Sequence, residues 1–177
     1  MNYFTRDRYL ALQDRGDDAM DAADAAWDEA VARYDAYLQT IRAEMPEAVR
    51  ELLDGFYLHD ARVLSMGRRG DTFVISLQLD APPNELLTIT YHLAGTPEIS
   101  QELFPWATAT ATPEWLHEEL ELIREGGQSH YVHSILFSNG WEVRLPFREV
   151  DLATAYPTFP YPRTPKPVTQ PPAPRSA

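Results

Sequence analysis

Two segments of the chain carry residue types that could do chemistry, and the first is Leu58-His59-Asp60. An imidazole beside a carboxylate is the pairing that general acid–base catalysis uses. We expect this segment at the start of a strand, where consecutive side chains point to opposite faces, so His59 and Asp60 are not expected to form a dyad. A structural interpretation is favoured, in which one of them hydrogen-bonds backbone donors left where helix becomes sheet. His59 and Asp60 are the candidate polar site of the chain.

The second segment is His130-Tyr131-Val132-His133, which has the spacing of a metal site on a helix. On a strand, an odd separation places the two rings on opposite faces of the sheet. His92 and His117 could converge with one of them, but no spacing indicates it. Nucleophile-elbow, dinucleotide and P-loop motifs are absent from the sequence. We therefore predict no catalytic, metal or cofactor-binding residue and no cofactor, and we expect surface or boundary histidines.

Acidic residues give the chain a formal net charge of −12, and they gather in two blocks. Residues 1–55 hold thirteen acidic residues and six arginines, and residues 81–125 hold eight acidic residues and one arginine. Such a surface repels nucleic acid and anionic membranes, and it can attract a basic protein. Solubility is the alternative explanation of the charge. We predict no nucleic-acid or membrane partner and, if there is a partner, a basic protein.

The absence of cysteine excludes disulfides, thiolate metal sites and thiol catalysis. No apolar stretch has the length of a signal peptide or a membrane span. The expected protein is soluble and cytoplasmic.

Helices are predicted for the first third of the chain. Thr5 can cap a short helix that runs to about Gln13, and a second short helix is expected from Pro46 to Leu53, stopped by Gly55. Between them, a long helix begins after Gly16. Its apolar residues recur at spacings of three and four, which predicts a core face, with a coiled coil as the alternative. This stripe consists of Met20, Ala23, Trp27, Val31, Tyr34, Leu38, Ile41 and Met45.

From Phe56 onward the apolar residues alternate, which predicts strands. The expected strands are 58–66, 72–79 and 86–93, with a turn at 67–70 and a long loop over 95–113. Residues 115–123 fit either a strand or a helix, and strand is favoured by the hairpin that follows.

The hairpin is predicted by Ser138-Asn139-Gly140-Trp141, because Asn-Gly supplies both positive-φ positions of a two-residue turn. That turn would place Leu136 opposite Val143 and Val132 opposite Phe147. One face would then be apolar and is expected to pack under the long helix. It would hold Val132, Leu136, Trp141, Val143, Leu145 and Phe147.

These elements predict an α+β fold, in which N-terminal helices, one of them long, pack on an antiparallel sheet of five or six strands. We expect one domain over 1–156, helical over 1–55 and sheet over 56–152. Residues 157–177 form a proline-rich tail that is expected to be disordered.

Three stretches together resemble a bacterial family of unknown function. Met1-Asn2-Tyr3-Phe4-Thr5 resembles the Met-x-Tyr-Phe-Thr start of that family, and residues 135–142 resemble its closing hairpin. Residues 58–63 resemble its Leu-His-Asp strand, which also recurs in small immunity-type domains of bacterial toxin systems. The family brings no established activity, so the resemblance implies the fold and a non-enzymatic role, and no functional residues.

Two functions are compatible with these patterns. The leading hypothesis is a non-enzymatic acidic protein-binding domain, immunity-like towards a basic partner. The alternative is a small enzyme or ligand-binding domain with a pocket near His59, Asp60 and the Phe104–Trp106 loop. A concave cleft with convergent polar groups would favour the alternative, whereas a flat acidic surface with exposed aromatic side chains would favour the leading hypothesis.

Overall fold

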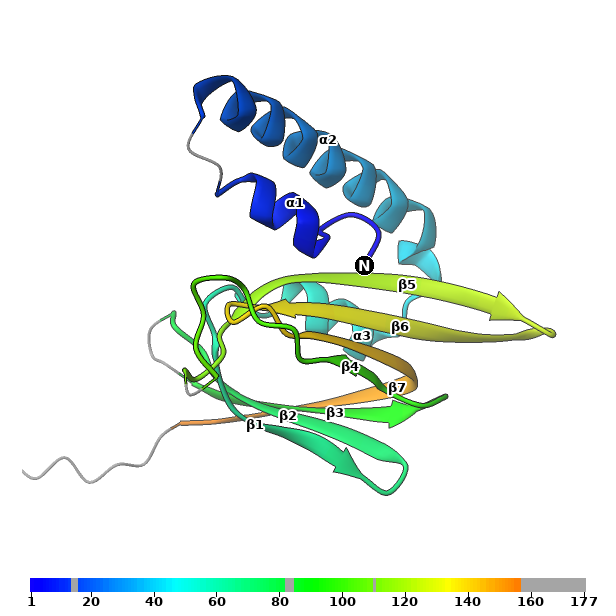
Figure 1. Ribbon diagram of the computed structural model, residues 1–177. Coiled ribbons are helices and arrows are strands. Elements are labelled where there is room, and N and C mark those ends of the chain that lie inside the picture. The colour runs from blue at the N-terminus through cyan, green and yellow to red at the C-terminus, as the bar shows by residue number, and fades with distance from the viewer. Residues whose placement is uncertain (14–15, 82–84, 110, 157–177) are drawn as a thin grey trace, which may run out of the picture.

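The structure is a computed structural model that describes residues 1–13, 16–81, 85–109 and 111–156 (Figure 1). It has the predicted α+β class, with three α-helices and a short 3₁₀ helix before an antiparallel sheet. The predicted tail, 157–177, lies outside the described residues. The helices are α1 (Arg6–Ala11), α2 (Asp17–Ile41), η1 (Arg42–Glu44) and α3 (Glu47–Asp54). The strands are β1 (Arg62–Arg69), β2 (Thr72–Gln78), β3 (Leu86–Leu93), β4 (Glu98–Ser100), β5 (Trp115–Glu125), β6 (Gln128–Phe137) and β7 (Glu142–Ala155).

The helix ends follow the local chemistry of the sequence. The Thr5 hydroxyl accepts a hydrogen bond from the Arg8 N–H at 3.3 Å and so caps α1, as predicted. Helix α3 begins after Pro46 and ends at Gly55, whose N–H donates to the Glu51 carbonyl at 2.8 Å. None of the helices that the structure describes is long and apolar enough to cross a membrane.

The long strand β7 lies at the centre of the sheet, whose order is β1-β2-β3-β7-β6-β5. Its first half pairs with β6 and its second half with β3, while β4 pairs with residues 142–144. The two outer strands meet at one end, where an isolated bridge joins Arg62 to Glu114 and the Trp115 N–H donates to the Ala61 carbonyl at 2.9 Å. The sheet therefore curls back on itself at that end, and the β1–β2 and β5–β6 hairpins diverge at the other (Figure 1).

Two segments differ from the predicted strands. Residues 58–61 form a turn, and β1 begins only at Arg62, because the backbone before it pairs with β5 instead of continuing the β1–β2 ladder. Inside the predicted loop 95–113, residues Glu98–Ser100 form β4, which makes the sheet seven-stranded where five or six strands were expected. The ambiguous segment at 115–123 is a strand, as favoured from the sequence.

The predicted register of the 138–141 hairpin is wrong by one residue. The Phe137 N–H donates to the Trp141 carbonyl and the Gly140 N–H donates to the Phe137 carbonyl, so the loop has three residues and not two. Gly140 takes the positive φ of 95° that closes such a loop. Ile135 consequently lies opposite Val143, and Tyr131 lies opposite Phe147. Because the register of β6 against β7 differs by one residue, the other face of β6 packs in the core. The core face therefore combines Tyr131, His133, Ile135 and Phe137 of β6 with Val143, Leu145 and Phe147 of β7.

The predicted packing of the long helix is also only partly correct. Tyr34, Ile41 and Met45 are buried at the C-terminal end of the stripe, but Met20 is 42% exposed. The N-terminal half of α2 packs against α1 (Figure 1), and Trp27 is the residue in it whose ring contacts His117 of β5. The short helix α3 enters the main core instead, with Val49 and Leu52 fully covered and contacts to β7.

Tyrosines of α2 cover the open edge of β5. The Tyr34 hydroxyl accepts a hydrogen bond from the Leu120 N–H at 2.6 Å, and the Tyr37 hydroxyl accepts one from the Leu122 N–H at 2.8 Å. An uncovered edge strand offers unpaired backbone groups to other chains. The helix thus protects this edge with side chains, since β5 is the outermost strand of the sheet in the described residues.

Candidate functional site

His59 and Asp60 lie in the turn that precedes β1. Asp60 has a positive φ of 65°, a left-handed conformation that aspartate tolerates better than most residues. Its N–H donates to the Trp115 carbonyl at 2.8 Å, which fixes the turn against β5. The His59 Nδ1 lies 3.0 Å from the Asp60 Oδ2. The expectation that the two side chains point apart is therefore wrong, because they are in a turn and not in a strand.

The structural role that we predicted for this pair is carried by the backbone. Within the described part of the chain, no backbone N–H donates to the His59 or Asp60 side chain, whereas the Asp60 backbone holds the turn. The His59 Nδ1 is covered and makes no hydrogen bond of normal geometry with the described residues, although Asp60 lies at ion-pair distance. The imidazole is held beside a carboxylate but is not locked by a directed hydrogen bond.

His59 lines a cleft of about 420 Å³ between α2, the α3–β1 connection and the start of β5. We call it the His59 cleft. Its polar and aromatic lining comprises the rings of Phe4, Tyr34, Phe56 and Tyr57, the carboxyl groups of Asp35, Asp54 and Glu118, and the imidazoles of His59 and His117.

His117 stands at one wall of the His59 cleft, enclosed by rings. Its ring centroid lies 4.6 Å from that of Trp27, 5.6 Å from that of Phe4 and 5.6 Å from that of His59. Burial, with a smaller contribution from the neighbouring His59, lowers the pKa of His117 to about 4, against an opposing effect of Asp60. His117 is therefore neutral near pH 7.

Glu118 follows His117 on β5 and points to the other side of the strand. The Trp115 indole N–H donates to its carboxyl group. Burial raises the pKa of Glu118, and the hydrogen bond from Trp115 and the charge of His59 oppose that rise. The cleft lies at the edge of β5 and is lined from both faces of that strand, by His117 on one side and by Glu118 on the other, with His59 from a distant segment.

His133 is not the surface or boundary histidine that we expected. It is fully buried, and its Nδ1 lies 2.8 Å from the Tyr91 hydroxyl, while its Nε2 has no hydrogen-bond partner among the described residues. Burial lowers the pKa of His133 to about 3. His130 lies on the opposite face, as the strand period predicts. Within the described ranges, no group of three or more histidine, aspartate or glutamate side chains is arranged to hold a metal ion.

The Phe104–Trp106 loop, expected beside His59 and Asp60, lies on the far side of His117. Phe104 packs on Tyr9 with ring centroids 5.3 Å apart, and Tyr9 in turn lies 5.9 Å from His117. Trp106 stacks on Phe104 at 4.9 Å and is 52% exposed. The loop supports the aromatic wall behind His117 but does not line the cleft.

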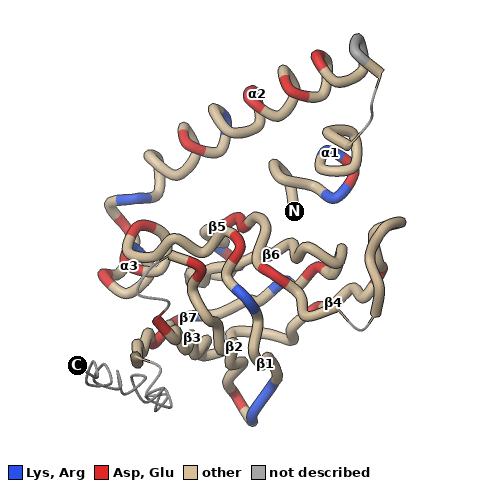
Figure 2. Tube along the Cα trace, turned by 90° about the vertical axis from the view of Figure 1, so that its left-hand side faces the viewer, with Lys and Arg blue, Asp and Glu red and all other residues tan. Residues whose placement is uncertain are grey.

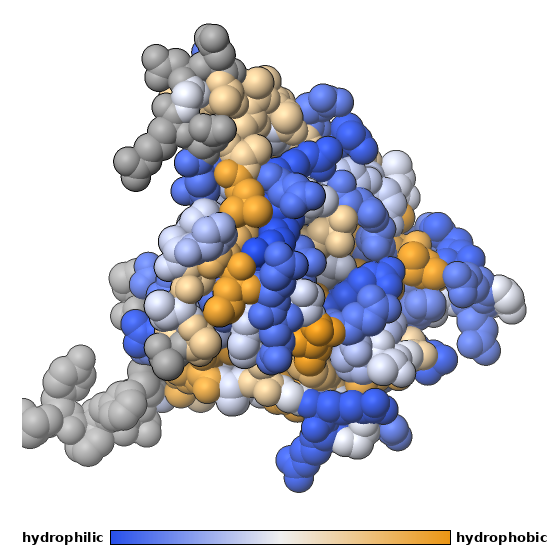
Figure 3. Space-filling model, in the orientation of Figure 1, coloured by the Kyte–Doolittle hydropathy of each residue, from blue (hydrophilic) through white to orange (hydrophobic). Residues whose placement is uncertain are grey.

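Acidic residues lie along α2, and one of them lines the His59 cleft. Figure 2 shows acidic residues spaced along this helix, of which Asp28 and Asp35 are exposed. Asp35 lines the cleft, and no lysine or arginine is among the described lining residues. Elsewhere on the face seen in Figure 3, apolar side chains form separate patches among hydrophilic ones.

Sequence reasoning found His59 and Asp60 but missed His117 and Glu118. The three consecutive ionisable residues 117–119, which follow the apolar pair Trp115-Leu116, were the available signal. Their position beside His59 depends on the bridge between β1 and β5, which no local pattern encodes.

Comparison with models of known protein families gives no match, and no curated protein matches the chain. The site must therefore be interpreted from its own geometry.

Proposed function

We propose that this chain is a non-enzymatic acidic protein-binding domain for a basic protein, and that the His59 cleft receives a cationic side chain of that partner. The observation that carries the proposal is the lining of the cleft, which combines carboxyl groups with aromatic faces and has no lysine or arginine among its described residues. Both kinds of group attract cations, the carboxylates by charge and the rings by cation–π interaction.

Two of the three carboxyl groups are available to such a partner. Asp54 already forms an ion pair with Arg42. Asp35 is exposed and has no cationic partner among the described residues, so it can meet an approaching cation at the rim. Glu118 is half-buried and accepts one hydrogen bond, from the Trp115 indole, so its carboxyl group can still pair with a cation, and a paired charge is worth more there than at the surface.

The charge of the whole chain supports the same choice of partner. A net charge of −12 speeds the approach of a basic protein and slows that of an acidic one. An immunity-like role, with a basic toxin as the partner, is the specific form that the family resemblance suggests. A toxin gene beside the gene for this chain would support that form.

The test is a titration with an arginine-rich peptide and with a peptide in which glutamate replaces each arginine. Glu118→Gln keeps an acceptor for the Trp115 indole but removes the charge, and it should weaken binding of the arginine-rich peptide by about thirtyfold or more. Asp35→Asn at the rim should weaken it by about two- to fivefold. Affinity should also rise with pH through the raised pKa of Glu118, because only the ionised carboxylate attracts the cation.

Asp28→Asn is the matched control, since it removes one exposed charge from the same helix outside the cleft. It should change affinity less than twofold, a difference of about 0.4 kcal/mol or less. If it weakens binding as much as Glu118→Gln, the attraction is diffuse and the cleft is not the site. Equal affinity for the two peptides would contradict the basic-partner proposal itself.

A second candidate function is a small enzyme or ligand-binding domain near His59 and Asp60. The observation that favours it is the meeting of His59, His117 and Glu118, because pKa values displaced in opposite directions are typical of acid–base sites. A protonated Glu118 can donate a proton, and a neutral imidazole can accept one. Turnover in a screen of hydrolysis and isomerisation substrates, lost in His59→Gln and kept in Asp28→Asn, would support this function over the first.

A further inference from the structure

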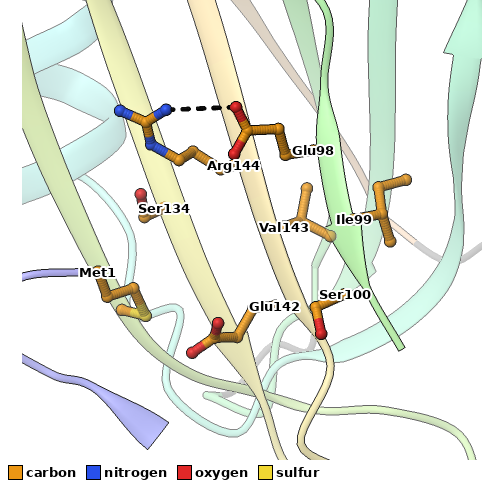
Figure 4. A pocket seen from close by; sticks show the side chains of 8 residues that line it. All are labelled: Met1, Glu98, Ile99, Ser100, Ser134, Glu142, Val143 and Arg144. Carbon is orange, nitrogen blue, oxygen red and sulfur yellow. Dashed lines mark ion pairs between the residues drawn. The ribbon is translucent and has the colours of Figure 1, made fainter. Parts of the chain in front are cut away.

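A second hollow, of about 290 Å³, lies on the outer face of β6, β7 and β4 (Figure 4). We call it the outer-face pocket. The strand register sets its side chains in two rows. Ser134 on β6 lies opposite Arg144 on β7, which lies opposite Glu98 on β4. In the next row, Glu142 lies opposite Ser100. Because these residues share one face of the sheet, polar groups of both charges line one small space.

Ser134 gives the outer-face pocket a buried and unsatisfied hydroxyl. The residue is only 2% exposed, and its Oγ has no hydrogen-bond partner among the described residues. Buried hydroxyls are nearly always paired, since an unpaired one loses its hydrogen bonds to water without replacement. Glu119, opposite Ser134 on β5, holds the backbone N–H groups of Asn2 and Tyr3 at 2.6 Å, so the N-terminal segment also covers this face. Ser134 lines the outer-face pocket, and its hydroxyl lies just beneath that lining without a partner among the described residues, so a ligand has to displace the covering side chains to pair with it.

Arg144 and Glu142 leave their charged groups available. The nearest carboxylate oxygens to the Arg144 guanidinium belong to Glu98 at 3.5 Å and Glu121 at 4.0 Å, which is longer than a charge-assisted hydrogen bond. Its planar fork of donors makes only these two long ion pairs, so a ligand carboxylate can compete for it with shorter, bidentate hydrogen bonds. Glu142 has no cationic partner among the described residues.

We propose that the outer-face pocket binds a compact zwitterion of the α-amino acid class. The ligand carboxylate lies on Arg144 and accepts a hydrogen bond from the Ser134 hydroxyl, and the ligand ammonium group lies on Glu142. Arg144 and Glu142 are two residues apart on one face of a strand, so their Cα atoms are about 7 Å apart and a small ligand lying between the two side chains can contact both. Ile99 and Met1 at the rim offer apolar contact to the ligand side chain.

The charges of the pocket exclude other small ligands. A phosphate or a dicarboxylate would bring two or more negative charges beside Glu142 and Glu98, with Arg144 as the one cation among the described lining residues to balance them. A simple amine would leave the Ser134 hydroxyl unpaired and would give Arg144 nothing beyond its two long ion pairs. Only a ligand with both charges pairs Arg144 and Glu142 together.

The test is a calorimetric and NMR titration of the full chain with L-alanine, and separately with its two halves, methylammonium and acetate. L-alanine should bind at least about tenfold more tightly than either half, because it makes both charged contacts at once. Arg144→Gln and Glu142→Gln should each weaken L-alanine binding by about tenfold or more. Arg148→Gln, an exposed arginine on the same strand, is the matched control and should leave affinity unchanged.

Ser134→Ala separates a ligand contact from a structural one. It should weaken L-alanine binding by about two- to tenfold while the melting temperature of the free protein stays the same or rises, because the hydroxyl has no partner to lose. A lower melting temperature in the free variant would overturn the assignment of that hydroxyl to a ligand. Methylammonium binding as tightly as L-alanine, or no saturable binding of L-alanine, would overturn the zwitterion proposal.

Discussion

Tyr34→Phe tests whether the long helix protects the edge of β5. The substitution removes only the hydroxyl that accepts the Leu120 N–H at 2.6 Å, and it leaves the buried ring in place. Burial raises the pKa of Tyr34, so the hydroxyl stays neutral at any working pH. Leaving a buried N–H without an acceptor costs about 1–3 kcal/mol of unfolding free energy. For a chain of this size, each kcal/mol lowers the melting temperature by about 2–4 °C.

Thermal and denaturant unfolding measure the loss, and amide hydrogen exchange locates it. The Leu120 amide should lose protection in Tyr34→Phe, while amides of β2 and β3 should follow the global stability only. Tyr37→Phe is the comparison, because Tyr37 makes the equivalent bond to Leu122 from a half-buried position where water can replace the hydroxyl. A Tyr34→Phe variant that unfolds with the parent and keeps Leu120 protected would refute the role of the hydroxyl at this edge.

Three further predictions concern stability. Melting temperature should fall as the pH drops from 7 towards 5, because His117 and His133, with folded pKa values of about 4 and about 3, stay neutral in the folded state while the unfolded chain takes up protons near pH 6.5. At the acid end, the raised pKa of Glu118 has the opposite effect on stability. A melting temperature of the parent that stays constant or rises as the pH falls from 7 to 5 would contradict the assignment of His117 and His133 as neutral in the folded state, and so would a pH dependence that His117→Gln does not flatten. Trp27→Ala should cost about 3 kcal/mol, the lower end of the range for a core tryptophan, since Trp27 is only half-buried; a melting temperature within a degree or two of the parent would show that the ring does not support His117. Glu119→Ala should cost at least about 2 kcal/mol and make the N-terminal segment sensitive to protease, since three backbone N–H groups lose one shared carboxylate; unchanged proteolysis would argue against that anchor.

Local patterns predicted the elements well where their causes are local. Thr5 and Pro46 each set a helix start through the backbone groups of the following turn. The alternation from Phe73 to Leu79 placed every second residue in the core, because a strand with one covered face needs that period.

The hairpin register could not be obtained in this way, because Asn139-Gly140 serves a two-residue and a three-residue loop equally well. Contacts from distant segments accompany the observed loop. Ser138 exchanges hydrogen bonds with the Glu114 backbone, and the Asn139 carbonyl accepts from the Phe104 N–H at 2.9 Å. A Cβ at Gly140 would stand 2.6 Å from the Phe104 nitrogen, so the tight approach requires glycine. These partners are far away in sequence, so the residues of the turn alone do not predict the loop length.

In the candidate site, too, the local pattern predicted one part and distant contacts determine the other. His59 and Asp60 stand out in the sequence as an adjacent polar pair, but the groups that they meet belong to β5. The long apolar stripe of α2 was equally ambiguous, since its period is the same whether it covers a sheet or a second helix. Which helix enters the curled sheet depends on connection lengths and closure, and α3 occupies that position.

The central place of β7 has a consequence for the order of assembly. Neither the β1–β3 meander nor the β5–β6 hairpin can satisfy its inner edge until residues 142–155 arrive between them. Such non-local pairing is slow to form, because the intervening chain must close as a large loop first. During that interval two apolar strand edges are open at once, the state in which chains associate with one another most readily. A nascent chain halted before residue 142 would remain in that state, so a polypeptide ending there is expected to aggregate, even though it contains six of the seven strands.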